Sequence, residues 1–289
     1  MTLGPPMSAT PSIPTAPRRM PLDVAGWVRY FQLVEIPVLA QTAGELEDMR
    51  ANEDAVDARM IGEVVSADPL MTLKLLAHTS SLHRVGRLNS DVETVTEGLV
   101  LMGITPFFNT FGPQPTVQQH LEEQPAALAG LMAVVQRSHR AAKFALGFAA
   151  HRLDPDVAVI YEAALLYDFT EMLLWLHAPA LALEIQQRQL NDPSLRSVTA
   201  QRDVLNVTLQ DIQQSLLRSW RLPELLLRIT DERHQEATQV RNVLLAIRLA
   251  RHSAKGWDNP ALPDDITDLS HLLNMAPAHV QRLVTDLDA

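Results

Sequence analysis

The spacing of apolar residues along the chain is that of amphipathic helices. Apolar positions recur every three or four residues, whereas alternating runs rich in Val, Ile and Thr, which are typical of strands, are few. The chain is rich in Leu and Ala and has only 11 Gly, which also favours helix. We therefore expect an all-α protein. Its longer helices should cover residues 22–31, 125–151, 154–177, 179–190, 198–220 and 237–254.

Shorter helices in the first third of the chain are predicted from their ends. Pro37 suits the first turn of a helix that runs to Met49, and Asp68-Pro69 combines an N-cap with a proline at the first helical position. Ser90-Asp91-Val92-Glu93 has the pattern of a capping box, and Gly103 should end the helix that follows it. This part of the chain should be a compact group of short helices.

Prolines and glycines divide the chain into four parts. Residues 1–20 hold five prolines among Ser, Thr and Ala, a composition that predicts a disordered tail. The segment Gly112-Pro113-Gln114-Pro115 interrupts any helix, and a turn over residues 256–260 precedes the last short helices. We expect a tail over 1–20, an N-terminal helical subdomain over 21–112, a second helical subdomain over 113–255 and a C-terminal helical extension over 256–289.

Composition narrows the function classes. A chain of 289 residues with 47% apolar residues can bury a sizeable core. Its formal net charge of −10 argues against direct binding of nucleic acid, whose phosphates require a basic surface. No Cys is present, and no apolar run approaches the ~18 residues that span a membrane. We expect a cytoplasmic protein that does not act at a membrane.

One carboxylate stands out within an apolar segment, residues 163–174. At helical spacing Asp168 has Ala164, Leu165, Glu171 and Met172 as neighbours, so it should point at least partly inward. An unpaired carboxylate in a core costs several kcal/mol, roughly, and must therefore meet a metal ion, a cation or hydrogen-bond donors. The nature of that partner should decide what the protein does.

Six short motifs follow one another over roughly residues 33–255. They are Ile36-Pro37-Val38-Leu39, Asp68-Pro69-Leu70 with Lys74-Leu75-Leu76, residues 98–103, residues 165–174, Trp220-x-Leu222-Pro223 and Ile247-Arg248-Leu249-Ala250. Taken in this order, they resemble the HDOD family, bacterial signalling domains related to the HD-domain metal phosphohydrolases. The resemblance implies a multi-helix fold in which a half of short helices packs on an HD-like helical bundle.

The resemblance also implies the place of a metal centre, and this chain departs from it. His139 is similar to the first metal-binding His, and Asp168 to the Asp of the His-Asp pair. Tyr167 stands where the paired His belongs, and Arg251 where the last Asp belongs. With two of four ligands replaced, we expect no bound metal, no cofactor and no catalytic residue. Our hypothesis is a vestigial pocket in which Arg251 pairs with Asp168 while His139 bonds the same carboxylate.

Simpler interpretations of these residues stand beside this hypothesis. His139 lies near Ala141, Ala142 and Phe144, as a buried structural histidine would. Asp168 could instead bond a backbone donor or an arginine of a neighbouring helix. His234, next to Arg233, has the position of a solvated helix end, where a cation is mildly favoured.

Three functions follow from the resemblance. The leading one is a non-enzymatic signalling scaffold that binds a protein partner. The second is a residual metal-dependent phosphohydrolase or phosphodiesterase that acts on a nucleotide or cyclic dinucleotide. The third is a nucleotide-binding sensor without turnover, in which His139, Arg140 and Arg251 contact an anion and His234 is a further candidate for ligand binding. Apolar surface on the N-terminal helices would allow a homodimer.

Overall fold

The computed structural model describes residues 20–84 and 92–288. In these ranges the chain forms seventeen α-helices and two short 3-10 helices, and its only β contact is an isolated bridge between Val38 and Thr116. The predicted all-α fold is confirmed. The predicted tail lies outside the described residues, apart from Met20.

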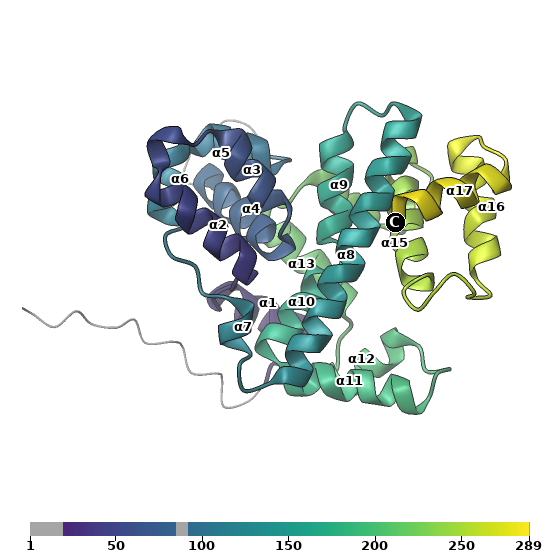
Figure 1. Ribbon diagram of the computed structural model, residues 1–289. Helices are drawn as coiled ribbons and strands as arrows, with labels where there is room; N and C mark the ends of the chain where they lie inside the picture. The colour runs from purple at the N-terminus through teal and green to yellow at the C-terminus, as the bar shows by residue number, and fades with distance from the viewer. Residues whose placement is uncertain (1–19, 85–91, 289) are drawn as a thin grey trace, which may run out of the picture.

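A first group of short helices packs around its own apolar cluster. Figure 1 shows the group together on one side of the molecule. Its buried cluster includes Ile61, Val65, Leu75, Leu99 and Phe107. The group consists of α2 (Ala40–Ala51), the 3-10 helix η1 (Glu53–Ala55), α3 (Ala58–Ser66), α4 (Pro69–Arg84), α5 (Val95–Met102) and α6 (Ile104–Thr110).

Side-chain caps begin three helices of this group, α3, α4 and α5. The Oδ1 atom of Asp68 accepts a hydrogen bond from the backbone N–H of Leu70 at 2.8 Å, so the predicted cap of α4 is confirmed. Gly103 ends α5 with φ of +81°, a conformation that glycine adopts without strain. The capping box predicted for residues 90–93 lies partly outside the described residues. The described capping box of α5 is formed by Thr94 and Glu97.

The start predicted at Pro37 is wrong, because α2 begins at Ala40. The preceding segment is extended. Val38 donates its backbone N–H to the carbonyl of Pro115 and accepts one from Val117, both at 2.9 Å. The Gly112–Pro115 segment is therefore hydrogen-bonded to the segment that enters α2.

The larger group of helices is built around α8 (Pro125–Arg152), which packs against α9 (Val157–Leu166), α10 (Phe169–His177) and α15 (Thr238–His252). Gly130 allows the close approach of α10, since a Cβ atom there would lie 2.5 Å from the ring of Trp175. The first helix, α1 (Val24–Leu33), packs on α13 (Leu209–Trp220) and contributes Trp27 and Phe31 to the core of this group. The remaining members are α7 (Val117–His120), α11 (Pro179–Asn191), α12 (Ser197–Leu205), α13 (Leu209–Trp220), α14 (Glu224–Ile229) and the 3-10 helix η2 (Glu232–His234).

Two predicted helices are each broken in two. The segment predicted over 198–220 divides at Asn206, which adopts φ of +62°, before Thr208 caps α13. The segment predicted over 154–177 divides at Tyr167 and Asp168, which separate α9 from α10. No Gly or Pro marks the second break, and we attribute it to the partners that Asp168 meets in space.

A buried acid joins the two groups. Glu162 of α9 is 4% exposed, and its two carboxyl oxygens lie 3.0 and 3.1 Å from the backbone nitrogen of Val95, at the start of α5. Burial raises the pKa of Glu162 to about 8, although the Val95 N–H opposes the shift.

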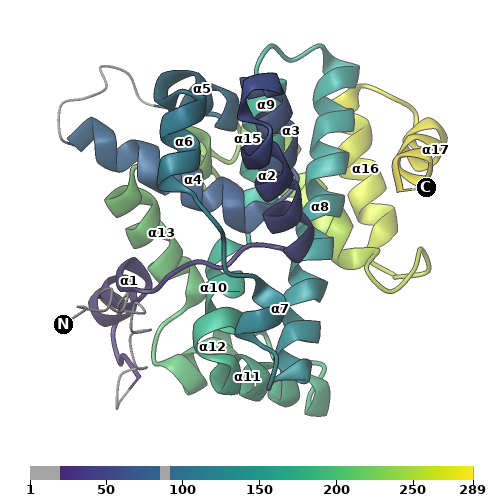
Figure 2. The same ribbon diagram turned by 60° about the vertical axis from the view of Figure 1, so that its left-hand side comes forward.

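The C-terminal extension forms α16 (Leu262–Leu273) and α17 (Pro277–Asp288). Both helices lie beside α8, on the side away from the first group (Figures 1 and 2). Arg140 of α8 holds α17 by donating two hydrogen bonds to Asp288, at 2.7 and 2.8 Å. Arg248 of α15 forms ion pairs with Asp265 and Asp268 of α16.

Candidate functional site

Asp168 occupies the break between α9 and α10. Its backbone, with φ of −94° and ψ of 18°, leaves the helix, while its carbonyl accepts hydrogen bonds from the N–H groups of Glu171 and Met172. The side chain does not cap α10 and is only 9% exposed. The expected inward direction is confirmed, although the residue lies at a helix junction and not within a helix.

Two arginines from different helices neutralise this carboxylate. Arg251 of α15 donates from Nη2 to Oδ1 at 2.7 Å, and Arg137 of α8 donates from Nε to Oδ2 at 3.0 Å. Arg137 also donates from Nη2 to the carboxylate of Glu171, again at 2.7 Å. The predicted pairing of Asp168 with Arg251 is confirmed. Each oxygen of Asp168 therefore has its own guanidinium partner.

The Tyr167 ring packs against Arg251, the more exposed of the two arginines. The guanidinium carbon of Arg251 lies over the Tyr167 ring, 5.4 Å from its centroid. The backbone carbonyl of Tyr167 accepts a hydrogen bond from the amide of Gln213 at 2.6 Å, which ties the helix break to α13. The residue that stands at the family's His position thus orients a cation.

The charges of the cluster balance. Burial alone would raise the pKa of Asp168, but the positive charges of Arg251 and Arg137 outweigh burial and hold that pKa below its ordinary value. Burial raises the pKa of Glu171, against the opposing charge of Arg137. With both carboxylates ionised, the two acids and two arginines sum to zero formal charge.

These residues do not fit a divalent metal. Three protein ligands are the usual minimum for a metal held by imidazole and carboxylate groups. Among the described residues, no three His, Asp or Glu side chains gather closely enough to hold an ion. Both oxygens of Asp168 already bond guanidinium groups, whose charge would repel a metal ion.

Three candidate residues lie elsewhere. His139 does not bond Asp168, so that part of the hypothesis is wrong. Its Nε2 atom lies 2.8 Å from the carbonyl oxygen of Ala67, at the end of α3, and Arg137 takes the place expected for it. Helical phase explains the exchange, because residues 137 and 139 of one helix face directions about 200° apart.

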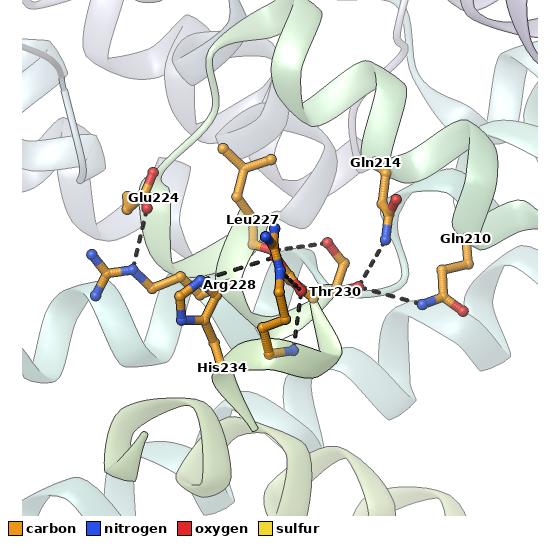
Figure 3. Close-up of polar contacts among 9 residues, drawn as sticks. Gln210, Gln214, Glu224, Leu227, Arg228, Thr230 and His234 are labelled. Atoms are coloured by element: carbon orange, nitrogen blue, oxygen red, sulfur yellow. Dashed lines mark hydrogen bonds and ion pairs between the residues drawn. The ribbon is translucent and has the colours of Figure 1, made fainter. Parts of the chain in front are cut away.

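Arg140 and His234 offer no anion site at Asp168. Arg140 is committed to Asp288, Ser253 and the carbonyl of Ala250. His234 lies in the turn η2 beside Thr230, whose carbonyl accepts hydrogen bonds from Gln210 and Gln214 (Figure 3). The His234 side chain is 47% exposed, which agrees with a solvated helix end, and its Nε2 atom lies 4.0 Å from Asp231.

A cleft of about 440 Å³ opens beside the cluster. Arg137, Tyr167, Asp168 and Arg251 form one wall of it. The other walls come from α10, α11, α12, α13 and the end of α15. They consist of Thr170, Glu171, Gln189, Ser197, Val198, Gln201, Leu209, Gln210, Gln213 and Ala254.

Sequence reasoning missed Arg137, Glu171 and the glutamines. Arg137 is one of four polar residues in Arg137-Ser138-His139-Arg140, and only the contact with α10 distinguishes it. A signal for Glu171 was present, since it lies three residues after Asp168 and so shares its face. The glutamines come from three different helices, and no local pattern connects them.

Two solved structures share this helical fold. The MmoQ response regulator of Methylococcus capsulatus superposes with a TM-score of 0.64 at 18% identity, over 86% of this chain and 98% of that chain. A virulence factor of Campylobacter jejuni superposes with a TM-score of 0.60 at 17% identity, over 92% and 94% of the two chains. The chain therefore has the same multi-helix fold as these two proteins.

The family follows from the sequence. The model of the HDOD domain matches residues 36–236. The chain belongs to the HDOD family, as the order of its motifs predicts. No curated protein is significantly similar to it in sequence. In the described residues, no helix combines the length and apolar character needed to span a bilayer.

Proposed function

We propose that this protein is a non-enzymatic signalling or regulatory scaffold of the HDOD type, which acts by binding a protein partner. One observation carries the proposal. Asp168, the acid that the family resemblance assigns to a metal centre, has both oxygens occupied by the guanidinium groups of Arg137 and Arg251. The positive charge of these two groups repels a metal ion and stabilises the ionised form of the carboxylate, so Asp168 is poorly suited to bind a metal or to accept a proton from water.

The partner is proposed to be a protein because the fold is one that signalling proteins use. The MmoQ neighbour is described as a response regulator. Val100 and Leu101 of α5 are exposed by 68% and 43% and supply an apolar surface for contact. Leu22 and Leu33, at the two ends of the α1 region, are exposed by 72% and 73% and offer the surface for a second copy of the chain.

Turnover assays test the proposal against a residual phosphohydrolase. Purified protein is incubated with Mn²⁺ or Mg²⁺ and a panel of nucleotide phosphoesters and cyclic dinucleotides. We expect no turnover above that of the Asp168→Asn variant, because that residue is paired in the native protein. Hydrolysis by the wild type that Asp168→Asn abolishes would reverse the assignment and make the protein an enzyme.

A further inference from the structure

The cleft beside Asp168 continues into a second hollow. A space of about 320 Å³ lies next to it, and the two share Glu171, Gln189, Ser197, Gln201 and Leu209 in their linings. Together they form a groove whose shared lining comes from α10, α11, α12 and α13. Its size is in the range of sites for small molecules.

The larger of the two spaces, next to Asp168, has no net formal charge when its acids are ionised, and it is rich in amides. The charged residues that line the larger space are Arg137, Arg251, Asp168 and Glu171, and their charges cancel. An anion in the larger space would meet as many negative as positive charges, and the further cation of the groove, Lys255, lines the smaller hollow. The main polar groups left to recognise a ligand are side-chain amides and hydroxyls.

Two of these side-chain amides each form one hydrogen bond within the protein, which fixes their orientation. In each amide one polar group is engaged and the other remains to contact a ligand. Gln201 accepts a hydrogen bond from the backbone N–H of Leu209 at 3.0 Å, so its oxygen is engaged and its NH₂ group has no partner among the described residues. Gln213 donates to the carbonyl of Tyr167, so its NH₂ group is engaged and its side-chain oxygen has no hydrogen-bond partner among the described residues. The lining thus offers a donor and an acceptor held by the protein backbone.

A flat surface lies in the same wall. The guanidinium of Arg251 covers one face of Tyr167, yet the Arg251 side chain remains 45% exposed. A guanidinium plane stacks well on planar rings. One wall therefore offers a stacking surface, and α12 and α13 offer the amide donor and acceptor.

We infer that this cleft binds a small, uncharged, planar heterocycle that carries an N–H donor beside a carbonyl acceptor, as the lactam edge of guanine, hypoxanthine or uracil does. The ring would stack on Arg251, and its donor and acceptor would meet the free oxygen of Gln213 and the free NH₂ of Gln201. A phosphate held in the same larger space would meet no net positive charge and should add nothing to affinity. The inference rests on the proposed function in one respect, that Asp168 stays paired with its arginines.

The probes are guanosine, inosine and uridine, with adenosine as the nucleoside that lacks a lactam and guanosine 5′-monophosphate as the charged counterpart. Binding is measured by isothermal titration calorimetry on the full chain. We expect at least one of the three lactam nucleosides to bind, adenosine to bind at least about tenfold more weakly, and the monophosphate to bind no tighter than guanosine.

Gln201→Glu is the informative variant. Glutamate keeps an oxygen for the Leu209 N–H but replaces the free donor with an acceptor, so affinity should fall by about tenfold or more. Gln187→Glu is the matched control, since it makes the same change of charge on α11 at an exposed position outside the cleft. It should bind as the wild type does.

Three results would overturn the inference. They are absence of binding by all three lactam nucleosides at millimolar concentration, equal binding by Gln201→Glu, and a monophosphate that binds more than tenfold tighter than guanosine. None of them bears on turnover. The binding experiment can therefore refute the proposed heterocycle site without refuting the non-enzymatic function, which the turnover assay tests.

Discussion

The variant Asp168→Asn isolates the ion pairs at the helix break, because asparagine keeps the shape of the side chain and removes its charge. Breaking a fully buried ion pair by removing one partner costs about 3–5 kcal/mol. Here Asp168 is 9% exposed, whereas Arg137 and Arg251 are 22% and 45% exposed and can be partly solvated by water. Arg137 also keeps Glu171. We therefore expect the free energy of unfolding to fall by about 2 kcal/mol.

Urea unfolding followed by circular dichroism measures this loss. The pKa of Asp168 is lowered in the folded protein, so its contribution is present above the ordinary aspartate pKa of about 3.9 and is lost as the pH falls through the folded value. The difference between wild type and variant should stay constant from pH 5 to pH 8 and shrink below about pH 4.

The control is Asp203→Asn. Asp203 is 52% exposed and lies 3.8 Å from Arg188, so its removal should change the free energy of unfolding by less than about 0.5 kcal/mol. If Asp168→Asn unfolded at the same urea concentration as the wild type, the two guanidinium contacts would not stabilise the protein, and the reasoning about the site would be refuted.

Three further variants test other parts of the structure. The pKa of Glu162 is raised in the folded protein, so the free energy of unfolding of the wild type, measured in urea titrations, should fall as the pH rises from 5 to 8. Over that range Glu162→Gln should lose roughly 3 kcal/mol less of this free energy, and equal pH dependence in the two proteins would show that Glu162 is not buried. Gly130→Ala should lower the free energy of unfolding by about 1–3 kcal/mol, since its Cβ would meet Trp175, and an unchanged urea midpoint would exclude that contact. Arg140→Met should increase hydrogen exchange in α17 by about tenfold, because the bidentate pair with Asp288 is lost, while exchange in α5 stays as in the wild type; uniform protection would contradict the pairing.

Much of the fold was predictable because its signals are local. The 28-residue helix α8 follows from an uninterrupted apolar pattern. Asp68 is a typical N-cap residue and Gly103 a typical C-cap residue, so they indicate a helix start and a helix end. The break at Asp168 was not predictable in this way. Neither Gly nor Pro occurs there, and the conformation depends on arginines that lie 31 residues before it and 83 residues after it.

The candidate site was likewise predictable only in part. Asp168 and Arg251 were found by the order of family motifs, which carries information about positions distant in sequence. Arg137 was missed in favour of His139, because a choice between two polar residues of one helix needs its rotation relative to its neighbours. The cleft is beyond sequence reasoning altogether, since its glutamines lie on α11, α12 and α13 and share a wall only after folding.

The most direct test of the central claim is the metal content of the purified chain after incubation with excess Mn²⁺ and exhaustive dialysis, measured by inductively coupled plasma mass spectrometry. Asp168 paired with Arg137 and Arg251 predicts less than about 0.1 metal ion per chain, in the wild type and in Asp168→Asn alike. Retention of about one ion per chain by the wild type, lost in Asp168→Asn, would contradict the account.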